Sequence, residues 1–291
     1  MPDNTNTQQT TFPLPSWLEE TRRMARAAGD AILAIYVKDF SVYQKSDASP
    51  LTEADLAAHR LIVEGLARLA PKLPILSEES VEEVPYEERA AWRSYWLVDP
   101  LDGTREFIKR RTDFTVNIAL IHEGHPILGV VHVPVQNRTY FAARGLGAHR
   151  QDQDNPPVAI KVRAEIDGPL KILGSRSHSS QLLDQYLTAA APDFGEYQLL
   201  TIGSSLKFCL VAEGAADLYP RFGPTSEWDT AAAHAIVLAA GGQVTDMKLN
   251  PLVYNQKPSL LNPFFFAFGH RRHDWSAFVP EDAEDSGPRG S

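Results

Sequence analysis

The chain has 291 residues, and its 43% hydrophobic and 22% charged residues are typical of a globular protein long enough to bury a sizeable core. The formal net charge of −9 argues against a nucleic-acid scaffold, which usually has a basic face. The single cysteine, Cys209, excludes an intramolecular disulfide and fits a reducing cytoplasm, and neither a signal peptide nor an apolar run long enough to span a membrane is evident.

Two helices are expected near the start of the chain. Residues 1–15 are polar and contain prolines, which predicts a disordered tail. The S-x-x-E pattern at 16–19 is a capping box and predicts a helix to about residue 37. The T-x-x-D pattern at 52–55 predicts a second helix to about residue 69.

Strands dominate the next part of the chain, and alternating strands and helices follow. Strands are expected at 75–77, 95–99, 114–121, 127–135, 139–143 and 157–162, with a hairpin turn at 123–126. Further strands are expected at 171–174, 197–202, 217–219, 242–245 and 264–268, and helices at 179–190, 204–214 and 228–240. We therefore expect an α+β half over 16–160, an α/β half over 161–280 and a disordered acidic tail over 281–291.

Carboxylates stand at the ends of several predicted elements. The run W-L-V-D-P-L-D-G-T places Asp99 and Asp102 at the end of an apolar strand, followed by a turn that can open a helix. The backbone N–H groups of such a turn can bind an anion. Glu78 follows another predicted strand, and Asp229 lies at the start of a predicted helix. The alternative for an isolated acidic residue at such a position is an ordinary helix cap or a solvated carboxylate.

Convergence of these carboxylates would require a cation. Two like charges 4 Å apart repel by about 4 kcal/mol at an effective dielectric constant of 20. A site built from carboxylates, without histidine or cysteine, favours Mg²⁺, Mn²⁺ or Ca²⁺ over Zn²⁺. The sequence therefore predicts a hard-metal site.

The same segments resemble the inositol monophosphatase superfamily of magnesium-dependent, lithium-sensitive phosphatases. The runs D-G-T-R-E-F at 102–107, G-S-R-S-H at 174–178 and G-P-T-S-E-W-D at 223–229 are similar to its bacterial 3′(2′),5′-bisphosphate nucleotidases of the CysQ type. The resemblance covers about residues 17–270 and implies a layered α/β/α/β/α sandwich with the site between its halves. It implies hydrolysis of adenosine 3′,5′-bisphosphate to AMP and phosphate, linked to sulfate assimilation.

The resemblance also implies roles for individual residues. Glu78, Asp99 and the carbonyl of Leu101 would hold one Mg²⁺, and Asp99, Asp102 and Asp229 a second. A third Mg²⁺ would share Glu78, which counts among the catalytic residues with Asp55 and Thr104. Asp55 and Thr104 would orient and help to deprotonate the attacking water, so that no phospho-enzyme is needed. Asp55 could instead be a plain helix cap.

The second phosphate of such a substrate needs cationic partners. Candidates are Arg176, Lys207 and Arg221, although each could be an ordinary surface charge. The remaining expected substrate contacts are Ser175 beside Arg176 and, around the cleaved phosphate, Glu78, Leu101, Asp102, Gly103, Thr104 and Asp229. Lys45 and His178 could also face the substrate or serve as surface groups.

Several other functions are disfavoured or left open by the sequence. No arginine follows Cys209 at the spacing of a cysteine phosphatase, and no P-loop motif is present. The D-x-D at 152–154 lies in an expected surface loop. The alternatives are an inositol monophosphatase or other sugar-phosphate phosphatase of the same fold, and a non-catalytic metal-binding regulator. The chain could be a monomer or a homodimer, and the resemblance implies a cytoplasmic protein with possible peripheral association at the inner membrane.

Overall fold

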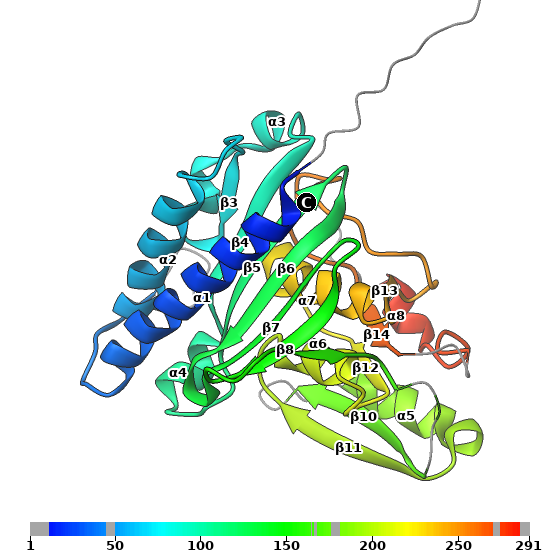
Figure 1. Cartoon of the computed structure of the whole chain (residues 1–291). Coiled ribbons are helices and arrows are strands. Elements are labelled where there is room, and N and C mark those ends of the chain that lie inside the picture. Colours follow the sequence, from blue (N-terminus) through cyan, green and yellow to red (C-terminus); the bar gives the residue numbers. More distant parts are fainter. Residues whose placement is uncertain are drawn as a thin grey trace, which may run out of the picture.

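The structure is a computed structural model, and it describes residues 12–44, 50–163, 165, 168–175, 181–269 and 274–285. Within these ranges the strands form a seven-stranded sheet, a five-stranded sheet and a separate two-stranded ladder. The two large sheets and the helices lie in layers (Figure 1). None of the helices in the described part of the chain is long and apolar enough to cross a membrane.

The first large sheet comes from the middle of the chain, residues 75–160. Its strand order is β3-β4-β5-β6-β7-β8-β9, and only the β3–β4 pair is parallel. The bounds are β3 Ile75–Ser77, β4 Ser94–Asp102, β5 Thr115–His122, β6 His125–Val133, β7 Arg138–Ala143, β8 Gly147–Asp152 and β9 Val158–Ile160.

The second large sheet is mixed and comes from the later part of the chain. Its order is β11-β10-β12-β14-β13, with β10 parallel to both of its neighbours and β14 antiparallel to its own. The bounds are β10 Leu170–Ser175, β11 Tyr197–Ile202, β12 Leu218–Arg221, β13 Gln243–Asp246 and β14 Phe265–Phe268.

Helices fill three layers around the sheets. The main helices are α1 Leu14–Tyr36, α2 Glu53–Leu66, α5 Gln181–Phe194, α6 Leu206–Ala212 and α7 Glu227–Ala239. Helices α1 and α2 cover one face of the first sheet, α6 and α7 lie between the two sheets, and α5 packs on the far face of the second (Figure 1). This arrangement is the predicted α/β/α/β/α sandwich.

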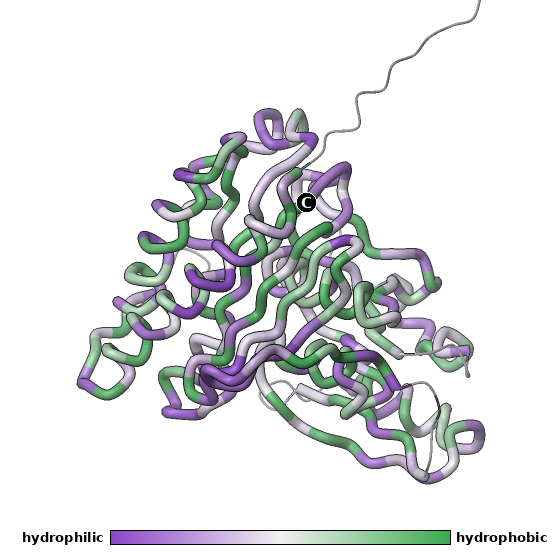
Figure 2. Tube along the Cα trace, in the orientation of Figure 1, coloured by the Kyte–Doolittle hydropathy of each residue, from purple (hydrophilic) through white to green (hydrophobic). Residues whose placement is uncertain are grey.

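Alternation along the strands explains why each sheet has two covered faces. In β4, Trp96 and Val98 join the core beneath α1 and α2, whereas Tyr95 and Leu97 join the core around α6 and α7. Successive side chains of a strand point to opposite faces, so an uninterrupted apolar run serves both cores. The central strands are accordingly hydrophobic along much of their length, while α1 alternates between polar and apolar residues (Figure 2).

The short elements complete the architecture. They are β1 Val42–Gln44, β2 Pro50–Thr52, η1 Glu78–Glu83, α3 Tyr86–Arg89, α4 Thr104–Ile108, η2 Pro134–Gln136 and α8 Glu281–Asp285. The hairpin predicted at 123–126 is confirmed as the β5–β6 connection. The capping box of the second helix is also confirmed, because Asp55 accepts from the backbone of Thr52.

Several local predictions are wrong. Ser16 lies inside α1, which begins at Leu14, and its hydroxyl donates to the carbonyl of Pro13. Phe12 is buried, so the predicted tail does not extend over 12–15, and α8 with buried Ala283 replaces the start of the predicted tail at 281. Residues 1–11 and 286–291 lie outside the described ranges.

Candidate active site

A bulge in β4 places two aspartates on the same face of the first sheet. Asp99 pairs with Asn117 of β5, but Asp102 pairs with Thr115, so three steps along β4 match two steps along β5. In a regular strand, side chains three residues apart point to opposite faces of the sheet. The extra residue of a bulge shifts the register by one, so that the two side chains point to the same face. Both aspartates therefore face the layer that contains α7.

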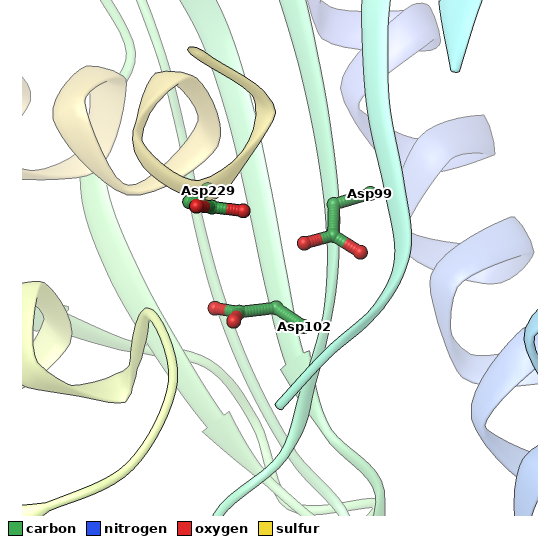
Figure 3. Close-up of side chains that lie close together, drawn as sticks. All are labelled: Asp99, Asp102 and Asp229. Atoms are coloured by element: carbon green, nitrogen blue, oxygen red, sulfur yellow. The ribbon is translucent and has the colours of Figure 1, made fainter. Parts of the chain in front are cut away.

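Asp229 reaches the same place from the start of α7. Carboxylate oxygens of Asp99, Asp102 and Asp229 all lie within 4.8 Å of one another. Their carboxylates point into a common space between β4 and the first turn of α7 (Figure 3). Glu78, the first residue of η1 after β3, lies close enough to Asp99 for its charge to raise the pKa of that carboxyl. The predicted convergence of Glu78, Asp99, Asp102 and Asp229 is present.

Repulsion within this cluster is large. Burial raises the pKa of Asp99 well above its usual range, and the charges of Glu78, Asp102 and Asp229 raise it further. Burial likewise raises the pKa of Asp229, followed by the charges of Asp102 and Glu78. Asp99 is only 1% exposed, so water cannot screen these charges. A cation is needed if all four groups are to be ionised together.

Asp55 and Thr104 form a pair beside the cluster. Asp55 is buried at the start of α2, and its Oδ2 accepts from the backbone N–H of Thr52 at 2.8 Å and from its hydroxyl at 2.6 Å. The Thr104 hydroxyl lies 3.1 Å from Asp55 Oδ1 and 3.1 Å from the carbonyl oxygen of Leu101. Since that hydroxyl has one hydrogen, it donates to one of the two acceptors at a time. Asp55 is therefore both the predicted helix cap and a partner of Thr104.

Gly103 connects the bulge to α4. Its φ of 94° lies in the left-handed region, and a Cβ would lie 3.4 Å from the carbonyl oxygen of Asp113. Glycine adopts this conformation without the steric penalty of other residues. The turn at Gly103 therefore connects Asp102, the last residue of β4, to Thr104, the first residue of α4.

A cavity of about 500 Å³ opens beside the carboxylates and is lined by residues of both sheets. Among the predicted site residues, it is lined by Glu78, Asp102, Gly103, Thr104, Ser175, Lys207, Arg221 and Asp229. Asp99, Leu101 and Asp55 are buried behind this lining. Arg176, Lys45 and His178 lie outside the described residues.

The two predicted cations in the cavity come from the second half of the chain. Lys207 of α6 is buried, and its ammonium donates to the carbonyls of Ile202 at 3.2 Å and Ser204 at 2.8 Å. Burial lowers the pKa of Lys207 to about 8, although the charge of Asp102 opposes this shift. Arg221 of β12 donates to the carbonyls of Gly223 and Pro224 at 3.2 and 3.0 Å. These bonds use only part of the donor capacity of either side chain.

Two polar residues of the site were not predicted from the sequence. The Ser205 backbone N–H donates to Asp102 Oδ2 at 2.5 Å, and the Ser205 hydroxyl lies 2.6 Å from the same oxygen. Asn117 donates to the Ser205 hydroxyl at 2.9 Å. Asn117 interrupts the apolar run of β5, and a polar residue in a buried strand is a signal that could have singled it out.

Comparison with known proteins agrees with this architecture. The sequence model of the inositol monophosphatase family matches residues 15–274. The 3′(2′),5′-bisphosphate nucleotidase CysQ of Shigella flexneri is 52% identical over 250 residues, covering 85% of this chain and 98% of that protein. The CysQ of Escherichia coli K12 is 50% identical over the same proportions.

Solved structures agree as well. The crystal structure of CysQ from Bacteroides thetaiotaomicron, described as a bacterial member of the inositol monophosphatase family, superimposes with a TM-score of 0.77 at 41% identity, covering 88% of this chain and 98% of that one. The inositol monophosphatase of Thermotoga maritima shares the fold, with a TM-score of 0.73 at 24% identity over 93% of this chain and 99% of that one.

The fold and the site therefore define a layered α/β protein whose two sheets enclose a cluster of carboxylates capable of holding divalent cations. The chain belongs to the inositol monophosphatase family.

Proposed function

We propose that this protein is a Mg²⁺-dependent 3′(2′),5′-bisphosphate nucleotidase that hydrolyses adenosine 3′,5′-bisphosphate to AMP and phosphate. The observation that carries the proposal is the convergence of Glu78, Asp99, Asp102 and Asp229 at one end of a cavity whose other walls hold Lys207 and Arg221. The 50–52% identity to CysQ nucleotidases supports the substrate class.

The residues of the cluster suit hard divalent cations. The donors are all oxygens, which Mg²⁺ prefers. Burial raises the pKa of Asp99 and of Asp229, and the neighbouring negative charges add to this effect, so bound cations would stabilise the ionised carboxylates. Asn117 Oδ1 is buried, and within the described part of the chain no donor reaches it, so hydrogen-bonding capacity remains for a bound group.

We infer the assignment of ligands from the family to which the chain belongs. Glu78, Asp99 and the Leu101 carbonyl would hold one Mg²⁺, Asp99, Asp102 and Asp229 a second, and Glu78 would contribute to a third. When bound, such cations supply Lewis-acid activation of a water molecule and neutralise the charge on the phosphate. Asp99 is central to the cluster and the most buried of its carboxylates.

Asp55 and Thr104 are the pair that handles the proton of the attacking water. The Thr104 hydroxyl lies at the cavity wall and can pass its hydrogen to Asp55 Oδ1 at 3.1 Å, while the other oxygen of Asp55 is held by Thr52. Asp55 Oδ2 thus accepts from Thr52, and Oδ1 is the oxygen that would take the proton from Thr104. The backbone N–H groups of Gly103 and Thr104 lie on the same wall, where they can receive the phosphate oxygens.

A substrate with two phosphates fits the distribution of charge in the cavity. The carboxylates that would hold cations come from the first sheet, η1 and α7, whereas Ser175, Lys207 and Arg221 come from β10, α6 and β12. One phosphate can be cleaved at the cations while the second contacts Lys207 or Arg221. If the substrate is adenosine 3′,5′-bisphosphate, we expect a role in sulfate assimilation, a cytoplasmic location and inhibition by lithium.

A substrate panel tests the proposal. Phosphate release is measured on adenosine 3′,5′-bisphosphate, inositol 1-phosphate and fructose 1,6-bisphosphate, with Mg²⁺ and with EDTA. We expect the highest kcat/KM for the nucleotide, and no turnover with EDTA. A higher kcat/KM for inositol 1-phosphate would contradict the assigned substrate, and unchanged activity in EDTA would contradict the metal mechanism.

Replacement of Asp99 tests the site itself. Asp99→Asn keeps the shape but removes the charge, and we expect kcat to fall by about 100-fold or more, as for the loss of a strong electrostatic contact. Asp154→Asn is the matched control, since Asp154 is exposed and pairs with Arg26 on the surface. Parent-like turnover by Asp99→Asn would show that Asp99 is not an essential ligand of the catalytic cations.

A further inference from the structure

Ser205 connects two of the carboxylate residues. It is 2% exposed and lies just before α6, in the loop after β11. Its N–H and hydroxyl lie 2.5 and 2.6 Å from Asp102 Oδ2, and the hydroxyl also lies 2.6 Å from the carbonyl oxygen of Asp229. One residue from the second half of the chain therefore contacts both β4 and the first turn of α7.

Both donors of Ser205 approach the same oxygen of Asp102, Oδ2. Asn117 donates to the Ser205 hydroxyl at 2.9 Å, so the single hydroxyl hydrogen goes to Asp102 or to the Asp229 carbonyl. The Ser205 N–H is directed at Asp102 Oδ2 in either case. Thr115 and Asn117 approach the same oxygen at 3.5 and 3.4 Å. Among the described residues these donors all approach Oδ2, so we assign Oδ1 as the oxygen that would bind a cation.

The loop that carries Ser205 is itself fixed by charged side chains. The Gly203 N–H donates to Asp113 Oδ2 at 2.5 Å, and Lys207 holds the carbonyls on either side, those of Ile202 and Ser204. A Cβ at Gly203 would lie 2.7 Å from Asp113 Oδ2, so the loop is packed as closely as glycine allows. The donors of Ser205 are therefore held in place before any ligand binds.

We propose that Ser205 is a positioning residue that orients Asp102 and the start of α7 toward a bound divalent cation. This inference rests on the metal site proposed above. Groups that hydrogen-bond to a ligand residue typically change metal affinity by about 10- to 100-fold when they are removed. The hydroxyl of Ser205 should have an effect of this kind without itself contacting the substrate phosphate.

The test measures Mn²⁺ binding to the whole chain in the absence of substrate, by electron paramagnetic resonance or calorimetry. We expect Ser205→Ala to weaken Mn²⁺ binding about 10-fold and to raise the Mg²⁺ concentration for half-maximal activity similarly. The KM for adenosine 3′,5′-bisphosphate at saturating Mg²⁺ should change by less than about twofold, because a group that acts through Asp102 affects the metal first. Ser205→Thr keeps the hydroxyl and should restore binding.

Ser94→Ala is the matched control. Ser94 is at the other end of β4, where its hydroxyl bonds His122 Nδ1 at 2.7 Å, and its removal should leave Mn²⁺ binding unchanged. If Ser205→Ala does not fold, Ser205→Gly retains the N–H and takes its place. If the variant without the Ser205 hydroxyl binds Mn²⁺ as tightly as the parent, the role of Ser205 is overturned and the proposed function is not. Absence of Mn²⁺ binding by the parent chain overturns the metal site and the proposed function together.

Discussion

At the scale of single residues, the cavity brings together carboxylates and cations from different elements. Asp102 and Glu78 come from the first-sheet side, and Lys207 and Arg221 from the second. Lys207 is largely engaged with the carbonyls of Ile202 and Ser204 and stabilises a loop. Arg221 is less buried, and within the described ranges its hydrogen bonds go to carbonyls of its own turn, so it is the better candidate for contact with the second phosphate.

Replacement of Arg221 should raise the KM of a bisphosphate substrate more than that of a monophosphate substrate. We expect Arg221→Gln to raise KM for adenosine 3′,5′-bisphosphate by about 10- to 100-fold, the loss for a charge-assisted hydrogen bond of roughly 1.5–3 kcal/mol. KM for inositol 1-phosphate, which has no second phosphate, should change by less than about threefold. Steady-state kinetics on both substrates measure the difference.

Arg144→Gln is the control for this pair of measurements, because Arg144 is exposed and lines a separate cavity with His125 and Leu238. It should leave both KM values at those of the parent. An equal rise in KM for both substrates in Arg221→Gln would place Arg221 at the cleaved phosphate or in a structural role.

At the scale of elements, the site depends on how closely α7 approaches β6. A Cβ at Gly129 would lie 2.0 Å from the carbonyl oxygen of Ala232 and 2.9 Å from the Cβ of Ala235. Ala231, Ala232 and Ala233 of α7 are all buried, so small side chains allow the helix to lie near the sheet. Because Asp229 is in the first turn of the same helix, this packing also sets the position of a carboxylate.

Gly129→Ala should therefore affect stability and metal binding together. The methyl group meets backbone rather than a flexible side chain, and we expect the free energy of unfolding to fall by roughly 3 kcal/mol, at the upper end of typical overpacking. Displacement of α7 should also weaken Mn²⁺ binding. Urea unfolding and Mn²⁺ titration of the same preparation measure the two effects.

Gly65→Ala provides the comparison for Gly129→Ala. Its added methyl meets the thioether of Met24 at 2.7 Å, a flexible group that can move aside. Its stability should stay within about 1 kcal/mol of the parent, since alanine favours helix. A loss as large in Gly65→Ala, or unchanged Mn²⁺ affinity in Gly129→Ala, would contradict the role given to the α7–β6 contact.

The sequence predicted elements with local signals better than features that depend on pairing. The capping box at Thr52 and the β5–β6 hairpin need only neighbouring residues, and both are present. Strand β8 was missed because its residues are polar, and ion pairs such as Arg150 with Asp152 and Glu213 stabilise it. Asp152 is the last residue of β8 itself, but Glu213 follows α6 and is 63 residues from Arg150, a contact that periodicity cannot reveal.

The same distinction applies to the site. The carboxylates could be identified because each ends a recognisable element, and their grouping followed from a family resemblance. The bulge that turns Asp102 toward Asp99 depends on register with β5. Ser205 and Asn117 are 88 residues apart in the chain, so their contact is visible only in the fold.

At the scale of the whole molecule, buried histidines connect stability to pH. His132 of β6 bonds the Thr139 hydroxyl at 2.9 Å, and His234 of α7 bonds the Tyr254 hydroxyl at 2.9 Å. Burial lowers the pKa of His132 to about 4 and that of His234 to about 3. Both histidines are therefore neutral in the folded protein near pH 7. They lie in different layers of the fold.

Acidification should therefore destabilise the fold. Between the folded pKa of about 4 for His132 and the unfolded value near 6.5, the unfolded chain binds more protons, so the free energy of unfolding falls as the pH falls. From pH 7 to pH 5 each of the two histidines should contribute a loss of roughly 2 kcal/mol. The carboxylate cluster acts in the opposite direction, because its raised pKa values favour proton uptake by the folded state.

A histidine variant isolates one contribution from this sum. His132→Gln stays neutral at both pH values and can still bond Thr139, so its loss of stability from pH 7 to pH 5 should be smaller than that of the parent by roughly 2 kcal/mol. Urea unfolding at the two pH values gives the difference, in which the contribution of the carboxylates cancels. His125→Gln, at an exposed position, should keep the loss seen in the parent. Because His132 packs against the backbone of Gly29 in α1, a variant that loses as much stability as the parent would mean that water reaches this layer and protonates the ring in the folded state.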